Sequence, residues 1–156
     1  MKQDKAINSV RIHWEGPFLN LNLDSPALDA TMGIYMFVDN DRGHNDKLIP
    51  RKVLYIGMTY YQTFRDEIQA KLRGALGKWL GQNKFDTTMK VAHVEAVDQE
   101  RISEALVRDI ENLLIMVIQP SGNIQSKESY SGRWPLRITN YGKYRPLPRM
   151  VSTNDL

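Results

Sequence analysis

The chain has 156 residues, of which 42% are hydrophobic and 25% charged, and its formal net charge is +3. This composition is ordinary for a globular protein and excludes a collagen-like, fibrous or wholly disordered chain. Cysteine is absent, which excludes disulfides, thiolate metal sites and a cysteine nucleophile.

The apolar runs of the chain are short. The longest wholly apolar run, Leu113 to Ile118, is far too short to span a bilayer. The first residues lead into no hydrophobic signal core. We therefore expect a cytoplasmic protein with no membrane partner, folded as a single domain.

The first half of the chain predicts strands separated by turn signals. Val10–Trp14 alternates apolar and polar residues, and Ser25 before a proline is typical of a helix start. Gly33–Val38 and Lys52–Met58 are rich in β-branched and aromatic residues, so each predicts a strand. The polar stretch Asp39–Pro50 predicts a long loop that joins these two strands into a hairpin.

The second half predicts two helices around a third strand. Thr63–Trp79 carries apolar residues at helical spacing, and Thr87–Val97 is rich in β-branched and small residues. Asp98–Gln119 has the clearest helical stripe and is ended by Pro120. The order hairpin, helix, strand, helix predicts a small α/β (α+β) fold with a three-stranded, mostly antiparallel sheet flanked by helices. Its core spans about residues 32–123, with flanking extensions at 1–31 and 124–156.

Basic residues gather near the C-terminus. The segment from Lys127 to Arg149 contains six basic residues and one acidic residue, a net charge of +5, with aromatic residues interleaved. Such a segment suits a phosphate backbone and exposed bases, although a solvated arm is the simpler alternative. The candidate nucleic-acid-binding residues are Arg73, Lys127, Arg133, Arg137, Lys143 and Arg145.

Two tripeptides and three single residues, taken in chain order, form one pattern of motifs. Gly33-Ile34-Tyr35 lies on the first hairpin strand and Tyr55-Ile56-Gly57 on the second. Arg65 follows Gly57 by eight residues, Glu111 lies in the long helix, and Asn123 follows it by twelve residues, just beyond a proline. In these motifs the chain resembles the GIY-YIG endonuclease family, over the stretch from Met32 to Asn123.

The resemblance implies a metal-dependent endonuclease that hydrolyses DNA phosphodiester bonds. Tyr35 would act as general base or orient the attacking water, and Tyr55 would hold the water or a phosphate oxygen. Arg65 would offset developing phosphoryl charge. Glu111 would bind one divalent ion, Mg²⁺ or Mn²⁺, and Asn123 would order the site through hydrogen bonds.

The chain also departs from the family pattern. Gln69 stands where many relatives carry histidine or tyrosine, and Met58 stands where some carry lysine. Two alternatives therefore stay open. The first is a catalytically weak or inactive GIY-YIG-fold module that binds nucleic acid, and the second is a partner-binding domain in which the tyrosines only pack. The sequence also leaves open whether the protein forms a homodimer.

Overall fold

A six-stranded mixed sheet, in the order β3-β2-β4-β1-β5-β6, forms the centre of the molecule. The computed structural model describes residues 8–19, 22–83, 85–97, 101–123, 132 and 135–156. The strands are β1 (Asn8–Phe18), β2 (Met32–Arg42), β3 (Leu48–Tyr60), β4 (Thr87–Ala96), β5 (Leu136–Gly142) and β6 (Met150–Ser152). The helices are α1 (Phe64–Arg73), α2 (Ala75–Asn83) and α3 (Glu104–Ile118), with 3-10 turns η2 (Pro26–Asp29), η3 (His44–Asp46) and η4 (Thr153–Asp155).

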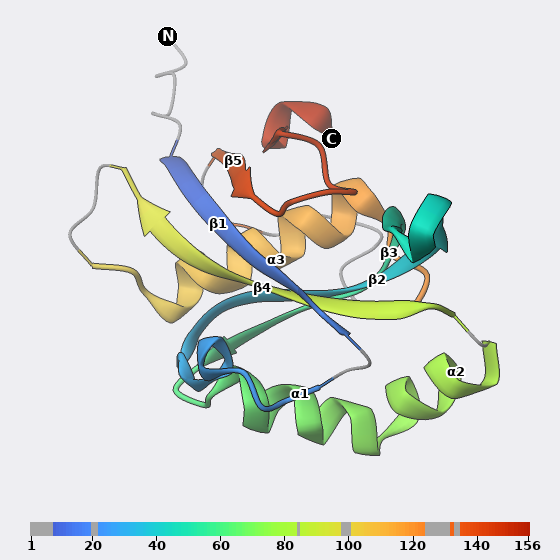
Figure 1. Cartoon of the computed structure of the whole chain (residues 1–156). Helices are drawn as coiled ribbons and strands as arrows, with labels where there is room; N and C mark the ends of the chain where they lie inside the picture. Colours follow the sequence, from blue (N-terminus) through green and yellow to red (C-terminus); the bar gives the residue numbers. More distant parts are fainter. Residues whose placement is uncertain (1–7, 20–21, 84, 98–100, 124–131, 133–134) are drawn as a thin grey trace, which may run out of the picture.

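The sheet curls, with helices on both of its faces. Figure 1 shows α3 on one side of the sheet and α1 and α2 on the other. Strand β2 pairs antiparallel with β3 and β4, β4 pairs antiparallel with β1, and β1 pairs in parallel with β5. The protein is therefore an α+β fold.

The expectation of a small three-stranded sheet is wrong, because both flanking segments add strands to it. In β1, Val10, Ile12 and Trp14 are buried while the residues between them are exposed, so one strand face packs into the core. In β5, Leu136 and Ile138 are buried in the same way. Apolar alternation in the two segments therefore favours pairing with the sheet over a solvated arm.

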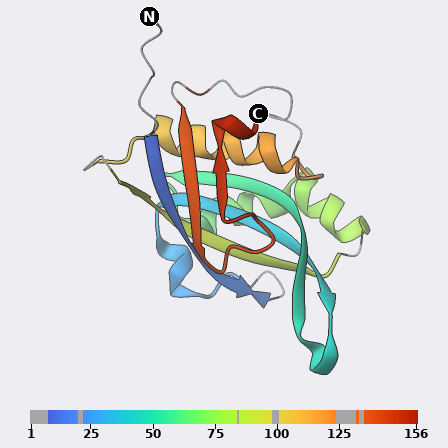
Figure 2. The same ribbon diagram turned by 90° about the horizontal axis from the view of Figure 1, so that it is seen from above.

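The connection between β2 and β3 is mostly strand, where the sequence predicts a polar loop. The two strands stay paired as far as Arg42 and Leu48, and the hairpin projects from the body of the protein in Figure 2. The nearly buried Asp39 accepts a 2.6 Å hydrogen bond from Arg51 across the hairpin. Polar residues can thus be accommodated in a strand pair when each carboxylate has a partner.

The predicted helix over Thr63–Trp79 is two helices. Thr63 is the N-cap of α1, and its side chain accepts a hydrogen bond from the Asp66 N–H. The helix ends at Gly74, where the backbone is extended (φ −97°, ψ −156°), and α2 follows at once. Gly81, expected beyond the helix, lies inside α2.

Two hydrophobic clusters hold these layers together. On one sheet face Ile34 and Met36 pack with residues of α3, including Ile110. On the other face Tyr35 and Phe37 pack with Phe64, Ile68 and other residues of the α1 and α2 side. Successive residues of β2 thus point into opposite clusters, which places Tyr35 on the same side of the sheet as α1.

Candidate active site

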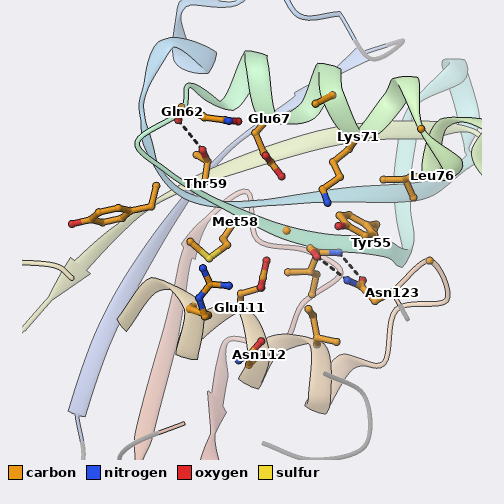
Figure 3. A pocket seen from close by; sticks show the side chains of 18 of the residues that line it. Tyr55, Met58, Thr59, Gln62, Glu67, Lys71, Leu76, Glu111, Asn112 and Asn123 are labelled. Atoms are coloured by element: carbon orange, nitrogen blue, oxygen red, sulfur yellow. Dashed lines mark hydrogen bonds between the residues drawn. The ribbon is translucent and has the colours of Figure 1, made fainter. Parts of the chain in front are cut away.

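A broad groove runs along β3, the edge strand of the sheet. It has a volume of about 1300 Å³ and lies between α1 and α2 on one side and α3 on the other. In Figure 3, Glu67 and Lys71 enter it from α1, Tyr55 from β3, and Glu111 from α3. Other lining residues are Met58, Thr59, Tyr60, Tyr61, Trp79, Glu104, Arg108, Asn112 and Asn123.

The two tripeptides face each other across the β2–β3 pair. Tyr35 lies directly opposite Gly57, and Phe37 lies opposite Tyr55. A Cβ atom at Gly57 would overlap the Tyr35 ring, so this glycine makes room for the phenol to cross the neighbouring strand. The Tyr35 and Tyr55 ring centroids are 6.1 Å apart, which confirms that the two rings share one sheet face.

Gly33 is required for a different reason. Its φ of +152° is unfavourable for residues with a side chain, and a Cβ atom there would overlap the Ala92 carbonyl oxygen and press on the Phe64 ring. The glycine therefore lets β2, β4 and α1 approach closely at this point. This approach helps to set α1, and the side chains that it carries, beside the groove.

The two phenols lie beside each other, and the inner one is hydrogen-bonded to a carboxylate. Tyr35 is fully buried, and its Oη donates a 3.2 Å hydrogen bond to Glu67 Oε1. Tyr55, whose ring centroid lies 6.1 Å from that of Tyr35, is half-buried. Burial raises the pKa of Tyr35 well above its usual value and raises the pKa of Tyr55 as well. Both phenols are therefore neutral near pH 7 and can pass a proton along but not act as standing phenolate bases.

The carboxyl group of Glu111 has a pKa far from its ordinary value. Burial raises its pKa to about 7, the charge of Glu67 adds to this, and Arg108 and Lys71 oppose it. A backbone hydrogen bond from Met58 on β3 also favours the ionised form. The Glu111 carboxylate therefore lies beside the edge of β3, where added positive charge would stabilise its ionised form.

Asn123 fastens the loop after α3 to the edge of β3. Its side-chain amide donates to the Ile56 carbonyl and accepts from the Ile56 N–H, each at 2.9 Å. The neighbouring Gly122 N–H donates to the Leu54 carbonyl at 2.7 Å. The side chain thus takes the place of another strand and satisfies edge groups that would otherwise be unpaired.

Arg65 does not reach the groove. Its guanidinium donates to the Leu23 carbonyl at 2.7 Å and the Ser25 carbonyl at 3.0 Å, and it forms an ion pair with Asp29. The resemblance gives this residue the role of stabilising phosphoryl charge. In the structure it instead tethers the segment before β2 to α1.

The groove cations come from positions that the sequence analysis did not select. Lys71 lines the groove from α1 and Arg108 lines it from α3. On α1, the buried Phe64 and Ile68 define the inner face of the helix, and Lys71 flanks that face on the side opposite to Arg65. A helical wheel would have shown these two flanks, but the sequence does not show which one borders the groove.

The oxygen donors in the groove fit a hard divalent cation such as Mg²⁺. Glu111 and Glu67 both line the groove, and Mg²⁺ in phosphate-processing sites commonly uses one or two carboxylates together with water and substrate. Within the described ranges no group of three or more His, Asp or Glu side chains could hold a metal ion. The donor set therefore suits an open site and not a closed protein cage.

Four of the predicted nucleic-acid-binding residues lie outside the groove. Arg73 is exposed in the last turn of α1, Arg137 lies on β5, and Lys143 and Arg145 follow that strand. None of these four lines the groove. Lys127 and Arg133 lie outside the described residues.

Comparisons with known proteins give no relative. The chain matches no protein-family model, no curated protein and no solved structure. The resemblance to the GIY-YIG endonucleases thus rests on the motif residues and stays a prediction. In the described part of the chain, no helix has the length and apolar character needed to cross a membrane.

Proposed function

We propose that the protein is a metal-dependent endonuclease that hydrolyses DNA phosphodiester bonds in the β3 groove. One observation carries the proposal: Tyr55, Lys71 and Glu111, from three different elements, line one open groove. These groups supply a proton-transferring hydroxyl, a cation and a metal-binding carboxylate, which are the parts that phosphodiester hydrolysis needs. The cysteine-free composition fits a reducing compartment, so we place the protein in the cytoplasm.

The neighbouring phenols offer a route for the water proton. An attacking water that donates to Tyr55 would be oriented by it, and its proton would leave through Tyr55 and the adjacent Tyr35, whose hydroxyl donates to the Glu67 carboxylate. This route does not need a tyrosinate at neutral pH, because each phenol gives up one proton as it accepts another. Glu67 thus serves as the final acceptor in a chain that lacks a histidine at position 69.

Glu111 would hold the divalent ion, Mg²⁺ or Mn²⁺. When bound, the ion supplies positive charge beside the phosphate and the departing oxygen. The raised pKa of about 7 means that the carboxyl is partly protonated at neutral pH and must lose its proton to bind metal. Metal binding should therefore strengthen as the pH rises through 7.

Lys71 and Arg108 would contact the phosphate. Both line the groove together with Glu111, and their positive charges lower its pKa. Arg108 also bonds Glu104 at 3.1 Å, so part of its charge is already paired. Lys71 is the stronger candidate for the role that the resemblance gives to Arg65.

The proposal is tested by incubating supercoiled plasmid with the protein and Mg²⁺ or Mn²⁺. Wild-type protein should nick or linearise the plasmid, and Glu111→Ala should show almost no cleavage. Glu95→Ala, which removes a carboxylate with a half-exposed side chain on β4, is the matched control and should cleave like wild type. Equal cleavage by wild type and Glu111→Ala would count against the metal assignment.

A second candidate function is nucleic-acid binding without cleavage. It is favoured by the contacts of the Arg65 guanidinium, which bonds to the segment at residues 23–29 and not to groups in the groove. The groove therefore lacks the arginine that the resemblance requires. In that case neither wild type nor any of the variants would cleave the plasmid. Gel-shift binding would persist and would weaken on Lys71→Ala.

A further inference from the structure

A solvent-facing aromatic side chain lines the groove. Tyr61, which directly follows β3, is 79% exposed and lines the groove. Among the described residues it is the most exposed of the large hydrophobic side chains and the single aromatic residue in that set. Burial in the core therefore does not explain the presence of a tyrosine at this position.

The backbone and the neighbouring ring hold Tyr61 in place. Its φ is +83°, a conformation that bulky side chains rarely adopt. Its N–H donates to the Thr31 carbonyl at 3.0 Å. The Tyr60 ring packs edge-on against it with centroids 4.5 Å apart, and Tyr60 is itself fixed by a 3.0 Å hydrogen bond to the Ile102 carbonyl.

We propose that Tyr61 stacks on an unpaired base next to the phosphate held in the groove. This inference rests on the proposed function and specifies its substrate as DNA with unpaired nucleotides, such as single strands, gaps or branch points. An exposed aromatic ring in a groove that is also lined by cations has the two features with which proteins bind single-stranded nucleic acid. A base in an intact duplex offers no free face for such stacking.

The spacing of the lining residues suits this role. Met58 and Tyr61 line the groove together with Glu111 and are three residues apart, which is at most roughly 10 Å along the chain. A nucleotide beside the one whose phosphate lies at Glu111 can therefore reach the Tyr61 ring. The preference for unpaired DNA would come from this one ring, while Lys71 and Arg108 contact any phosphate backbone.

The test is a binding measurement without metal, so that it does not depend on cleavage. Fluorescence anisotropy in EDTA compares a single-stranded oligonucleotide with the same sequence as a blunt duplex. Tyr61→Ala should weaken single-strand binding by roughly 5- to 150-fold and leave duplex binding within about twofold. Tyr61→Trp, which keeps a stacking surface, should retain single-strand binding.

Ile49→Ala provides the control, because Ile49 is an exposed large hydrophobic residue outside the groove. It should leave both affinities unchanged. Unchanged single-strand binding by Tyr61→Ala overturns the inference. An equal loss on single strand and duplex also overturns it. Plasmid nicking by wild type but not by Glu111→Ala would stand in either case, so the two proposals fail separately.

Discussion

Replacing Glu111 by glutamine should stabilise the protein at alkaline pH while removing its metal site. The folded-state pKa of Glu111 is about 7, compared with an ordinary value of 4.5. The folded protein therefore binds more protons than the unfolded chain between these two values. Stability associated with this group is highest below about pH 4.5, falls as the pH rises towards 7, and is level above that.

The magnitude follows from the size of the shift. A difference of about 2.5 pKa units corresponds to roughly 3 kcal/mol of unfolding free energy at pH 8. Glutamine keeps an oxygen for the Met58 hydrogen bond and carries no charge, so Glu111→Gln should recover up to about this amount. For a domain of this size the melting temperature should then rise by roughly 6–12 °C.

Thermal unfolding from pH 4 to pH 8 measures the effect. The variant should match wild type at pH 4, exceed it increasingly up to about pH 7, and keep a constant advantage from there to pH 8. Added Mg²⁺ should stabilise wild type alone. Asp24→Asn removes an exposed carboxylate outside the groove and should follow the wild-type curve. A Glu111→Gln effect that is independent of pH, or a variant less stable than wild type at pH 8, would refute the assigned environment of Glu111.

Three further substitutions test other parts of the site. Lys71→Met should lower cleavage by about 100-fold with little change in the melting temperature, and it should move the rising limb of the pH–rate profile to higher pH because Lys71 lowers the pKa of Glu111, which must be ionised to bind metal; an unchanged rate would exclude Lys71 from the reaction. Asn123→Ala leaves the N–H and C=O of Ile56 without their partner and should cost about 3 kcal/mol in urea unfolding, whereas a loss below about 0.5 kcal/mol would mean that water replaces the side chain. Gly57→Ala should destabilise by about 1–3 kcal/mol through overlap with the Tyr35 ring, and Tyr35→Leu in the same chain should restore part of the loss; no rescue would contradict the packing explanation.

Local pattern predicted the elements that carry the site better than it predicted the sheet. The periodicity of residues 33–38 and 52–58 identified the strands that bear Tyr35 and Tyr55, since alternation and β-branching are local properties. The same holds for the helix that bears Glu111. In the sequence, only the order of the motifs indicated that four of the predicted site residues would meet around β3 and its edge. These residues are Tyr35, Tyr55, Glu111 and Asn123.

The sheet extension and the groove cations depend on contacts that are distant in sequence. Asn8 pairs with Leu136, and no local signal in either short segment specifies that partner. Similarly, Arg65 and Lys71 flank the same buried stripe of α1, and the sequence does not show which flank faces α3. The segment at residues 23–29, which binds Arg65, decides the outcome.

The most direct test of the account is single-turnover cleavage of a labelled oligonucleotide in H₂¹⁸O with Mg²⁺, followed by mass spectrometry of the products. The account predicts cleavage that depends on Glu111, with one solvent oxygen incorporated into the product phosphate, because a water molecule is the nucleophile. Absence of cleavage, or cleavage without ¹⁸O in the phosphate, would contradict it.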